Sequence, residues 1–539
     1  MTTTTTPTGA AHPAGSGQPA VPATVAVGPE PLTVADVVAV ARHGAGVVLT
    51  DAAVEAVAAT RAAIEALAAR DEPVYGVSTG FGALATLHIP AADRERLQRS
   101  LVRSHAAGAG PAVEREVVRA LMLLRLHTLA TGRTGVRVST ARAYAALLSA
   151  GITPVVHEYG SLGCSGDLAP LAAVALALIG EGDVRDADGV LRPAAEALAA
   201  AGLEPVTLAA KEGLALINGT DGMLGMLVLA LHDLRALLTV ADVAAAASVE
   251  ALLGTDRAFA DDLMRLRPHP GQADSAANLR AVLGSSAVVA SHRTPDCTRV
   301  QDAYSLRCAP QVHGAARDTV SHAETVAARE LASAIDNPVV TPDGRVESNG
   351  NFHGAPVGYV LDFLAIVVAD VASMSERRTD RFLDTARSHG LAPFLAEDAG
   401  VDSGLMIAQY TAAGIVSELK RLAAPASVDS IPSSAMQEDH VSMGWHAARK
   451  LRRAVDGLAS VLAIELLTAT RALEIRCSAT VPPLAPGLAT AALLATLRAG
   501  GVGGPGPDRH LAPEIGAATD LVRSGAVLAA VQTVTGDLR

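Results

Sequence analysis

Long stretches with a helical pattern of apolar residues restrict the fold of this chain most strongly. We expect a long apolar helix from near Met223, further long helices over about 357–378 and 404–424, and a helix of about thirty residues from near Ser442. Apolar residues form 50% of the chain but aromatic residues only 2%, so aliphatic side chains and alanine must fill the core. The sequence therefore predicts a mainly α protein built around a long-helix bundle.

Charge and cysteine content exclude several classes of function. A net charge of -12 disfavours binding to nucleic acid, because phosphate backbones attract basic surfaces. The apolar run at 168–179 contains Pro170 and is too short to span a membrane. The four cysteines lack C-x-x-C spacing and no export signal is evident, so we expect a cytoplasmic protein. The histidines of the middle segment match no known metal-site spacing, and we predict no bound metal.

A glycine-rich stretch at 160–170 holds three residues that could react with one another, Cys164-Ser165-Gly166. Glycine gives the backbone the freedom that a tight loop needs. If the amide nitrogen of Gly166 attacks the carbonyl carbon of Cys164 and two waters are lost, the second from the Ser165 hydroxyl, an electrophilic methylidene ring forms. A serine-esterase elbow is a poorer explanation, because Asp167 stands where G-x-S-x-G requires glycine. A plain glycine-rich turn before a buried helix is the remaining alternative.

This stretch closely resembles the signature of the aromatic amino acid ammonia-lyases, in which Ala is usual at the position of Cys164. The resemblance implies that Cys164, Ser165 and Gly166 form a methylidene-imidazolone prosthetic group autocatalytically, with no external cofactor. It also implies a helix bundle of the ammonia-lyase/fumarase-like type with an N-terminal, loop-rich catalytic domain. We expect an N-terminal domain at 32–221 that carries this loop, and a central long-helix bundle with a C-terminal helical part at 222–539. The start of the chain is rich in Thr, Pro, Ala and Gly with little that could pack, which predicts a disordered tail at 1–31.

A second glycine loop, at 74–82, carries Tyr75. Its three glycines favour either a mobile lid over a ligand or an ordinary surface loop. The loop is similar to the tyrosine loop of the same family, with Ser78 where Asn is common. The resemblance implies that Tyr75 takes the substrate β-proton. That role requires the pKa of Tyr75 to fall well below the usual tyrosine value of about 10.

Two further segments indicate which amino acid is the substrate. The pair Ser104-His105 resembles the form found in histidine-specific family members, whereas a lone histidine is otherwise most often structural. Gln437-Glu438 also resembles the histidine-specific form, although Met436 replaces the usual Asn. A carboxylate can accept an imidazole N–H, but beside a phenyl ring it would stay unpaired at a cost of about 1–3 kcal/mol or more. The resemblance implies that His105 and Glu438 position the imidazole, that Gln437 also binds the substrate, and that Glu438 is an alternative base.

The remaining predicted site residues lie in three segments. Asn218 precedes a glycine, which is typical of a turn or cap, but the resemblance places it beside the ring and the substrate. Gln301, Tyr304 and Arg307 recur every three residues, so on a helix they would lie on one side. Arginine binds carboxylates in a bidentate manner, which makes Arg307 the candidate for the substrate carboxylate. The resemblance assigns ring support to Gln301 and Tyr304, a catalytic role to Tyr304, and a place at the ring pocket to Phe352.

The family resemblance as a whole implies elimination of ammonia from L-histidine to give trans-urocanate, the first step of histidine degradation. It also implies a homotetramer whose active sites combine three subunits. A phenylalanine or tyrosine ammonia-lyase, or an aminomutase, would use the same ring. His105 and Glu438 argue against the first two and leave the aminomutase open. An inactive helical scaffold or binding protein without the ring is the alternative of another class. We expect neither nucleic acid nor membrane partners.

Overall fold

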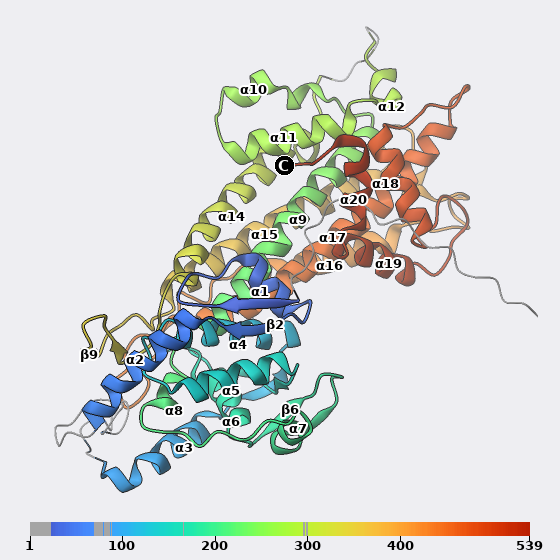
Figure 1. The fold of residues 1–539 in the computed structure, drawn as a ribbon. Coiled ribbons are helices and arrows are strands. Elements are labelled where there is room, and N and C mark those ends of the chain that lie inside the picture. Colours follow the sequence, from blue (N-terminus) through green and yellow to red (C-terminus); the bar gives the residue numbers. More distant parts are fainter. Residues whose placement is uncertain are drawn as a thin grey trace, which may run out of the picture.

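The computed structural model describes residues 23–68, 79, 87, 89–164, 166–294, 297 and 300–539. Helices account for 59% of the structure and strands for 7%, which confirms the predicted mainly α class. Four long helices pack against one another along the molecule (Figure 1): α9 (Asp221–Ala251), α14 (Ala309–Leu331), α15 (Ala355–Leu383) and α17 (Gly444–Ser478). The predicted long-helix bundle is therefore present.

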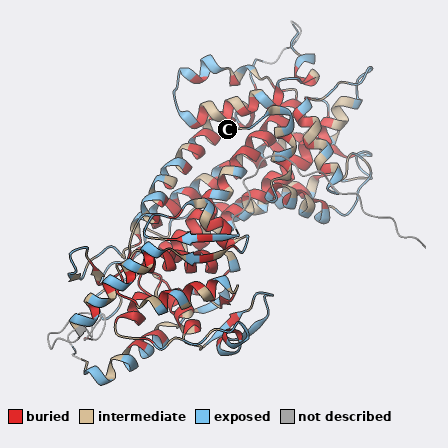
Figure 2. Ribbon diagram, viewed as in Figure 1, coloured by how far each residue is buried: buried red, intermediate tan, exposed pale blue. Residues whose placement is uncertain are grey.

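The long helices form the core because aliphatic residues and alanine cover most of their surfaces. Residues 237–252, which include the second half of α9, are all buried (Figure 2). A helix that is apolar on every side belongs in the middle of a large protein or in a membrane. By length and composition, α9 and α15 could each cross a membrane, but 78% and 61% of their apolar windows are buried inside the molecule. This burial is the pattern of core helices.

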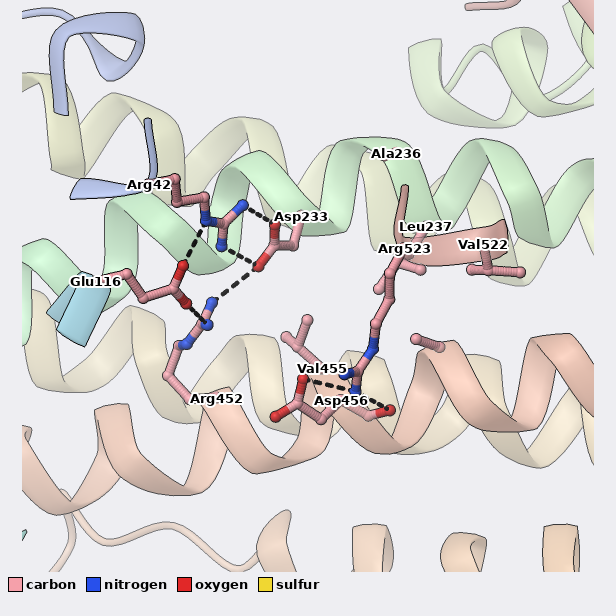
Figure 3. Close-up of a pocket in the computed structure, with 11 residues that line it drawn as sticks. Arg42, Glu116, Asp233, Ala236, Leu237, Arg452, Val455, Asp456, Val522 and Arg523 are labelled. Carbon is pink, nitrogen blue, oxygen red and sulfur yellow. Dashed lines mark hydrogen bonds and ion pairs between the residues drawn. The ribbon is translucent and has the colours of Figure 1, made fainter. Parts of the chain in front are cut away.

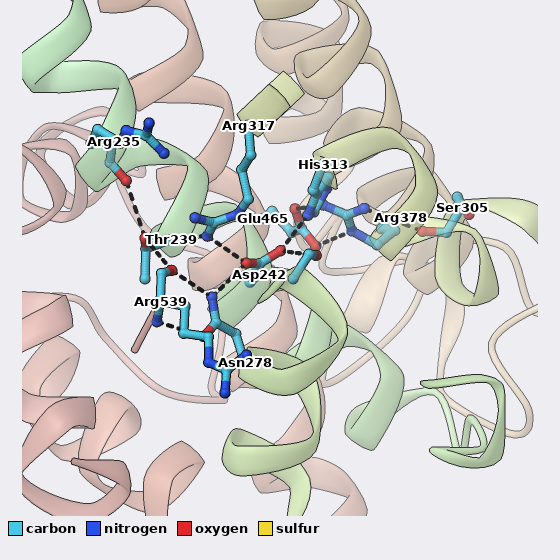
Figure 4. A network of polar contacts seen from close by, with 11 residues as sticks. Arg235, Thr239, Asp242, Asn278, Ser305, His313, Arg317, Arg378, Glu465 and Arg539 are labelled. Carbon is cyan, nitrogen blue, oxygen red and sulfur yellow. Dashed lines mark hydrogen bonds and ion pairs between the residues drawn. The ribbon is translucent and has the colours of Figure 1, made fainter. Parts of the chain in front are cut away.

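Buried ion pairs fix how the long helices meet (Figure 4). The Arg378 guanidinium on α15 donates to Glu465 on α17 with an Nε–Oε1 distance of 2.5 Å. Asp242 on α9 accepts hydrogen bonds from His313 on α14 at 2.8 Å and from Asn278 at 2.9 Å. Removing one partner of a buried pair leaves an uncompensated charge, so these contacts hold the helices in one register.

The N-terminal part of the chain packs on one end of the bundle and contains short helices and small sheets (Figure 1). The parallel pair is β1 (Thr24–Val27) with β2 (Gly46–Leu49), and β3 (Ala109–Ala112) runs antiparallel to β5 (His157–Tyr159). The three-stranded sheet contains β4 (Thr153–Pro154), β6 (Asp183–Arg185) and β7 (Leu191–Pro193). The helices here are α1 (Val34–Ala41), α2 (Asp51–Ala68), η2 (Ala91–Asp93), α3 (Arg94–His105), α4 (Arg115–Ala130), α5 (Val138–Ser149), α6 (Leu168–Leu178), α7 (Ala194–Ala200) and α8 (Glu212–Ala215).

Shorter elements connect and follow the long helices. Many of them lie at the end of the bundle opposite the N-terminal part, where α10, α12 and α18 are found (Figure 1). They are η3 (Arg257–Phe259), α10 (Asp261–Arg265), α11 (Pro270–Leu283), α12 (Ala287–Ser291), α13 (Tyr304–Arg307), the antiparallel pair β8 (Val339–Val340) and β9 (Val346–Glu347), η4 (Pro393–Leu395), α16 (Met406–Leu422), α18 (Leu488–Ala499), α19 (Ala512–Arg523) and α20 (Ala526–Thr535).

The predicted disordered tail at 1–31 is wrong for its last residues. β1 lies within that range and pairs in register with β2. Val25 and Val27 are only 4% and 0% exposed, because alternate residues of β1 face the core. Residues 1–22 lie outside the described part of the chain.

A cavity of about 260 Å³ marks the junction between the N-terminal part and the bundle (Figure 3). Arg42, just after α1, bonds both Glu116 on α4 and Asp233 on α9, and Arg452 on α17 bonds the same two carboxylates. Burial opposes the charge of Arg42, but the two carboxylates outweigh it and raise the pKa of this group. These four charges neutralise one another, so the ion pairs hold the N-terminal part of the chain against the bundle.

Candidate active site

The glycine-rich stretch lies where three segments of the chain meet. The carbonyl of Gly163 accepts hydrogen bonds from the Ser442 hydroxyl at 2.6 Å and from the Gly354 amide at 3.0 Å. One residue earlier, the carbonyl of Leu162 accepts from the Met443 amide at 2.9 Å. These bonds join the loop to the segments that precede α15 and α17. The segments that carry Phe352 and Glu438 are therefore held next to the loop.

Gly166 adopts a conformation that requires glycine. Its φ is +81°, and a Cβ at this position would lie 2.0 Å from the carbonyl oxygen of Gly219. Gly166 forms a β-bridge with Gly219, and the amide of Asp167 donates to the Gly219 carbonyl at 2.6 Å. A side chain here would force the two strands of backbone apart. Ser165, between Cys164 and Gly166, lies outside the described residues.

Asp167 anchors the loop to the first turn of α9. Its carboxylate accepts from the amides of Gly222 at 2.8 Å and Met223 at 3.0 Å, and from the Ser161 hydroxyl at 2.8 Å. These two amides are among the helix donors that have no intrahelical acceptor, and Thr220, the N-cap, makes no side-chain cap bond. Complete burial raises the pKa of Asp167 to about 7, although the three donors oppose this shift. From the sequence, Asp167 was notable only for breaking the esterase pattern, and nothing in the motif indicates its bonds to α9.

Asn218 is buried beside the loop, with 4% of its surface exposed. Its side-chain oxygen has no hydrogen-bond partner among the described residues. The next residue, Gly219, is the one that pairs with Gly166. A buried amide left unsatisfied at this position is suited to a further polar group in the loop, because buried polar atoms are nearly always hydrogen-bonded.

His105, Cys164 and Glu438 gather at one side of the loop. The thiol of Cys164 lies 3.8 Å from Oε2 of Glu438, and the Ser433 hydroxyl donates to the same oxygen at 3.1 Å. His105 ends α3, with Nδ1 2.9 Å from the Leu101 carbonyl. Burial lowers the pKa of His105, while the Leu101 carbonyl and the negative charge of Glu438 partly offset the effect. A neutral imidazole and a carboxylate thus lie within electrostatic range of each other.

Other residues predicted nearby have different environments. Gln437 and Met436 are exposed in a tight hairpin closed by the Ser433–Glu438 bridge. Phe352 is half-buried. The histidine that follows it, His353, places Nε2 3.1 Å from Nδ1 of His440, with the two rings stacked. This contact links the Phe352 segment to the Glu438 segment without bringing Gln437 to the loop.

The polar group Gln301, Tyr304 and Arg307 lies at the other end of the bundle. Asp302 accepts from the Thr255 amide at 2.7 Å, just beyond the last residue of α9, whereas Asp167 binds the first turn of α9. A helix of 31 residues spans about 45 Å, which is far longer than an amino acid substrate. In one chain, therefore, these residues and the glycine-rich loop do not form a single site.

The prediction that Gln301, Tyr304 and Arg307 share one face of a helix is also wrong in part, because α13 begins only at Tyr304. Gln301 precedes this helix and is exposed. Tyr304 is 70% exposed, and the Arg307 guanidinium lies 4.7 Å from the centre of its ring. Nε of Arg307 is buried without a hydrogen-bond partner among the described residues. Tyr75 lies outside the described residues.

The described residues contain no group of three or more histidine, cysteine and acidic side chains that could hold a metal ion.

Comparisons with known proteins agree on one family. The family model described as aromatic amino acid lyase matches residues 32–499. Histidine ammonia-lyase from Streptomyces griseus is 67% identical over 515 residues, covering 96% of this chain and 99% of the relative. Histidine ammonia-lyase from Streptomyces coelicolor is 66% identical, covering 96% of this chain and 100% of that relative.

The solved structures most similar to this fold include a tyrosine aminomutase from Streptomyces globisporus. Its TM-score is 0.90 at 37% identity, covering 96% of this chain and 100% of that one. Histidine ammonia-lyase from Trypanosoma cruzi has a TM-score of 0.86 at 38% identity, covering 95% of each chain. The predicted ammonia-lyase type of helix bundle is thereby confirmed. Since sequence and fold match over most of the chain, this protein belongs to the aromatic amino acid lyase family.

Proposed function

We propose that this protein eliminates ammonia from L-histidine to give trans-urocanate. The observation that carries the proposal is the grouping of His105 with Glu438 beside the glycine-rich loop, because a carboxylate at this position can accept the N–H of an imidazole substrate. A phenyl side chain would offer this carboxylate no donor in place of the water it displaces, at a cost of about 1–3 kcal/mol. The names of relatives that are 65–67% identical to this chain support the same substrate.

Members of this family use an autocatalytic methylidene-imidazolone group, and we propose Cys164, Ser165 and Gly166 as its source here. Two features of the structure fit the group. Gly166 is packed so closely against Gly219 that no side chain could replace its hydrogen, and the buried oxygen of Asn218 lacks a partner among the described residues. The group supplies an electrophile that takes up the substrate amino group and makes its nitrogen a better leaving group.

The chain's own residues have separate proposed roles around this loop. Glu438, with His105 nearby, orients the imidazole and excludes a purely apolar side chain. Tyr75 takes the β-proton, with Glu438 as the alternative base. The side-chain amide of Asn218 bonds polar atoms of the ring or substrate, with its NH2 group as donor and its unpartnered oxygen as acceptor. Arg307 binds the α-carboxylate, a role that its unpartnered buried Nε favours.

Self-association is part of this proposal, because Gln301, Tyr304 and Arg307 can reach the loop only from another copy of the chain. A homotetramer with shared active sites would bring them there. An apolar surface on α15 and α16 supports contact between copies, since several of its large side chains are between 47% and 62% exposed and would be covered by a second apolar face. These side chains are Tyr359, Phe363, Ile366, Ile407 and Tyr410. The cytoplasmic setting stays a prediction from the cysteine pattern.

The test measures urocanate by its near-ultraviolet absorbance after L-histidine is added to the purified protein. We expect product from the parent and none from Ser165→Ala, and intact mass should show that the parent alone has lost two waters. If the parent has lost both waters but forms no urocanate from L-histidine, histidine is refuted as the substrate. L-phenylalanine and L-tyrosine are then tested, with chromatography for β-amino acids, because similar structures include a tyrosine aminomutase. A parent that keeps both waters would refute the ring and the activity together.

A further inference from the structure

We propose that the side chain of Cys164 positions Glu438 for the imidazole of the substrate, in addition to the role of its main chain in the ring. The inference rests on the proposed function. It starts from the 3.8 Å contact between the Cys164 sulfur and Oε2 of Glu438, which joins the glycine-rich loop to a segment 274 residues later in the chain.

The segment that carries Glu438 is a small exposed hairpin that needs such a contact. Its backbone is closed by bonds between Ser433 and Glu438, with N–O distances of 2.7 and 3.2 Å. Ser434, Ala435 and Met436 between them all have positive φ and are exposed. Three consecutive residues in this conformation are costly for L-amino acids, so the turn does not hold its geometry from local preference alone. Contacts made by the Glu438 side chain contribute to its position.

Two donors bind the same oxygen of the Glu438 carboxylate. The Ser433 hydroxyl lies 3.1 Å from Oε2 within the hairpin, and the Cys164 thiol reaches it from the loop. The serine sets the carboxylate relative to its own hairpin, whereas the cysteine sets it relative to the reacting residues. Together the two donors fix the plane of the carboxylate and hence the direction in which it meets an imidazole N–H.

The surroundings keep the Cys164 thiol protonated, so that it acts as a donor. Cys164 is 5% exposed and packs with Val441 and Met443 in a small apolar cluster. Burial, followed by the negative charge of Glu438, raises its pKa to about 12. A hydrogen bond to a carboxylate is stronger in such a low-dielectric place than in water. Ring closure uses only the carbonyl carbon of residue 164, so its thiol remains available.

The first experiment compares Cys164→Ala, which removes the donor, with Cys164→Ser, which restores one. Intact mass establishes that each variant has lost two waters. For Cys164→Ala we expect the KM for L-histidine to rise about 3- to 10-fold, the effect of one lost hydrogen bond, with kcat within about twofold. Cys164→Ser should recover the parent KM within about twofold. Cys477→Ala, at a cysteine on α17 outside the site, is the matched control and should leave both constants unchanged.

The second experiment separates positioning of Glu438 from general packing. L-histidine binding is measured by calorimetry in the Ser165→Ala background, where no turnover occurs, for Cys164→Ala, Glu438→Gln and the double variant. If Cys164 acts through Glu438, its removal weakens binding about 3- to 10-fold only when Glu438 is present. An equal loss in both backgrounds, or no loss in either, overturns the inference while parent activity stands. A parent that neither binds L-histidine nor forms urocanate overturns the proposed function as well.

Discussion

Replacing Asp167 with alanine should detach the glycine-rich loop from the start of α9. The carboxylate accepts from the amides of Gly222 at 2.8 Å and Met223 at 3.0 Å, and Asp167 is 0% exposed. Without it, two buried amides at the positive end of the helix lose their acceptor. Each buried donor without a partner costs about 1–3 kcal/mol, so the first turn of α9 should lose about 2–6 kcal/mol of local stability.

Hydrogen exchange measured by mass spectrometry tests this prediction at the affected turn. Peptides that cover the first turn of α9 should exchange faster in Asp167→Ala than in the parent. Asp167→Asn, which keeps one carbonyl oxygen, should lie between them. Asp188→Ala, at an exposed aspartate away from the loop, is the control. A change of less than about fivefold in the exchange rate, equivalent to about 1 kcal/mol, would refute the capping role of Asp167.

Two further predictions concern buried charges. The pKa of Asp167 is about 7 in the folded protein, above its ordinary value of 3.8, so the folded state binds a proton more tightly than the unfolded state does. The free energy of unfolding should therefore fall as pH rises between these two values. Thermal unfolding of the parent should show this slope, and an equal slope in Asp167→Asn would contradict the assignment. Lys211 and Asp336 form an ion pair at 2.5 Å with both side chains 0% exposed, so Lys211→Met should cost about 3–5 kcal/mol. The double variant Lys211→Met with Asp336→Leu should recover most of that loss in denaturation experiments, and a double variant as unstable as the single one would count against the pair.

Features set by local sequence could be predicted. The long helices were expected because their apolar residues recur with helical spacing, and α15 and α17 begin within a few residues of the expected positions. The need for glycine after Ser165 was expected from the ring chemistry, and the structure adds a packing reason, the contact with Gly219. The strand at Thr24–Val27 was missed because a short β segment in a Thr- and Pro-rich region has no periodicity to detect.

Contacts between distant segments could not be predicted from spacing. Asp167 directly follows the reactive residues in the sequence. Its role as a cap depends on α9, which begins 54 residues later in the chain. Ser433 acts on Glu438 through a hairpin with three positive φ values, which no turn signal in the sequence marks with glycine. In both cases the side chain is ordinary, and only the folded position gives it a function.

The predicted site residues lie far apart in the folded chain. Sequence patterns cannot reveal this, because they do not show which residues come from which copy of the chain. The sequence motifs predict Asn218, Arg307 and Glu438 as residues of one active site. The structure places Asn218 and Glu438 with the loop and Arg307 beyond the far end of α9, about 45 Å away along a helix of 31 residues. No rearrangement of side chains closes that distance while the buried ion pairs of the bundle persist. The two groups can therefore serve one substrate only where copies of the chain meet, so self-association belongs to the proposed chemistry itself.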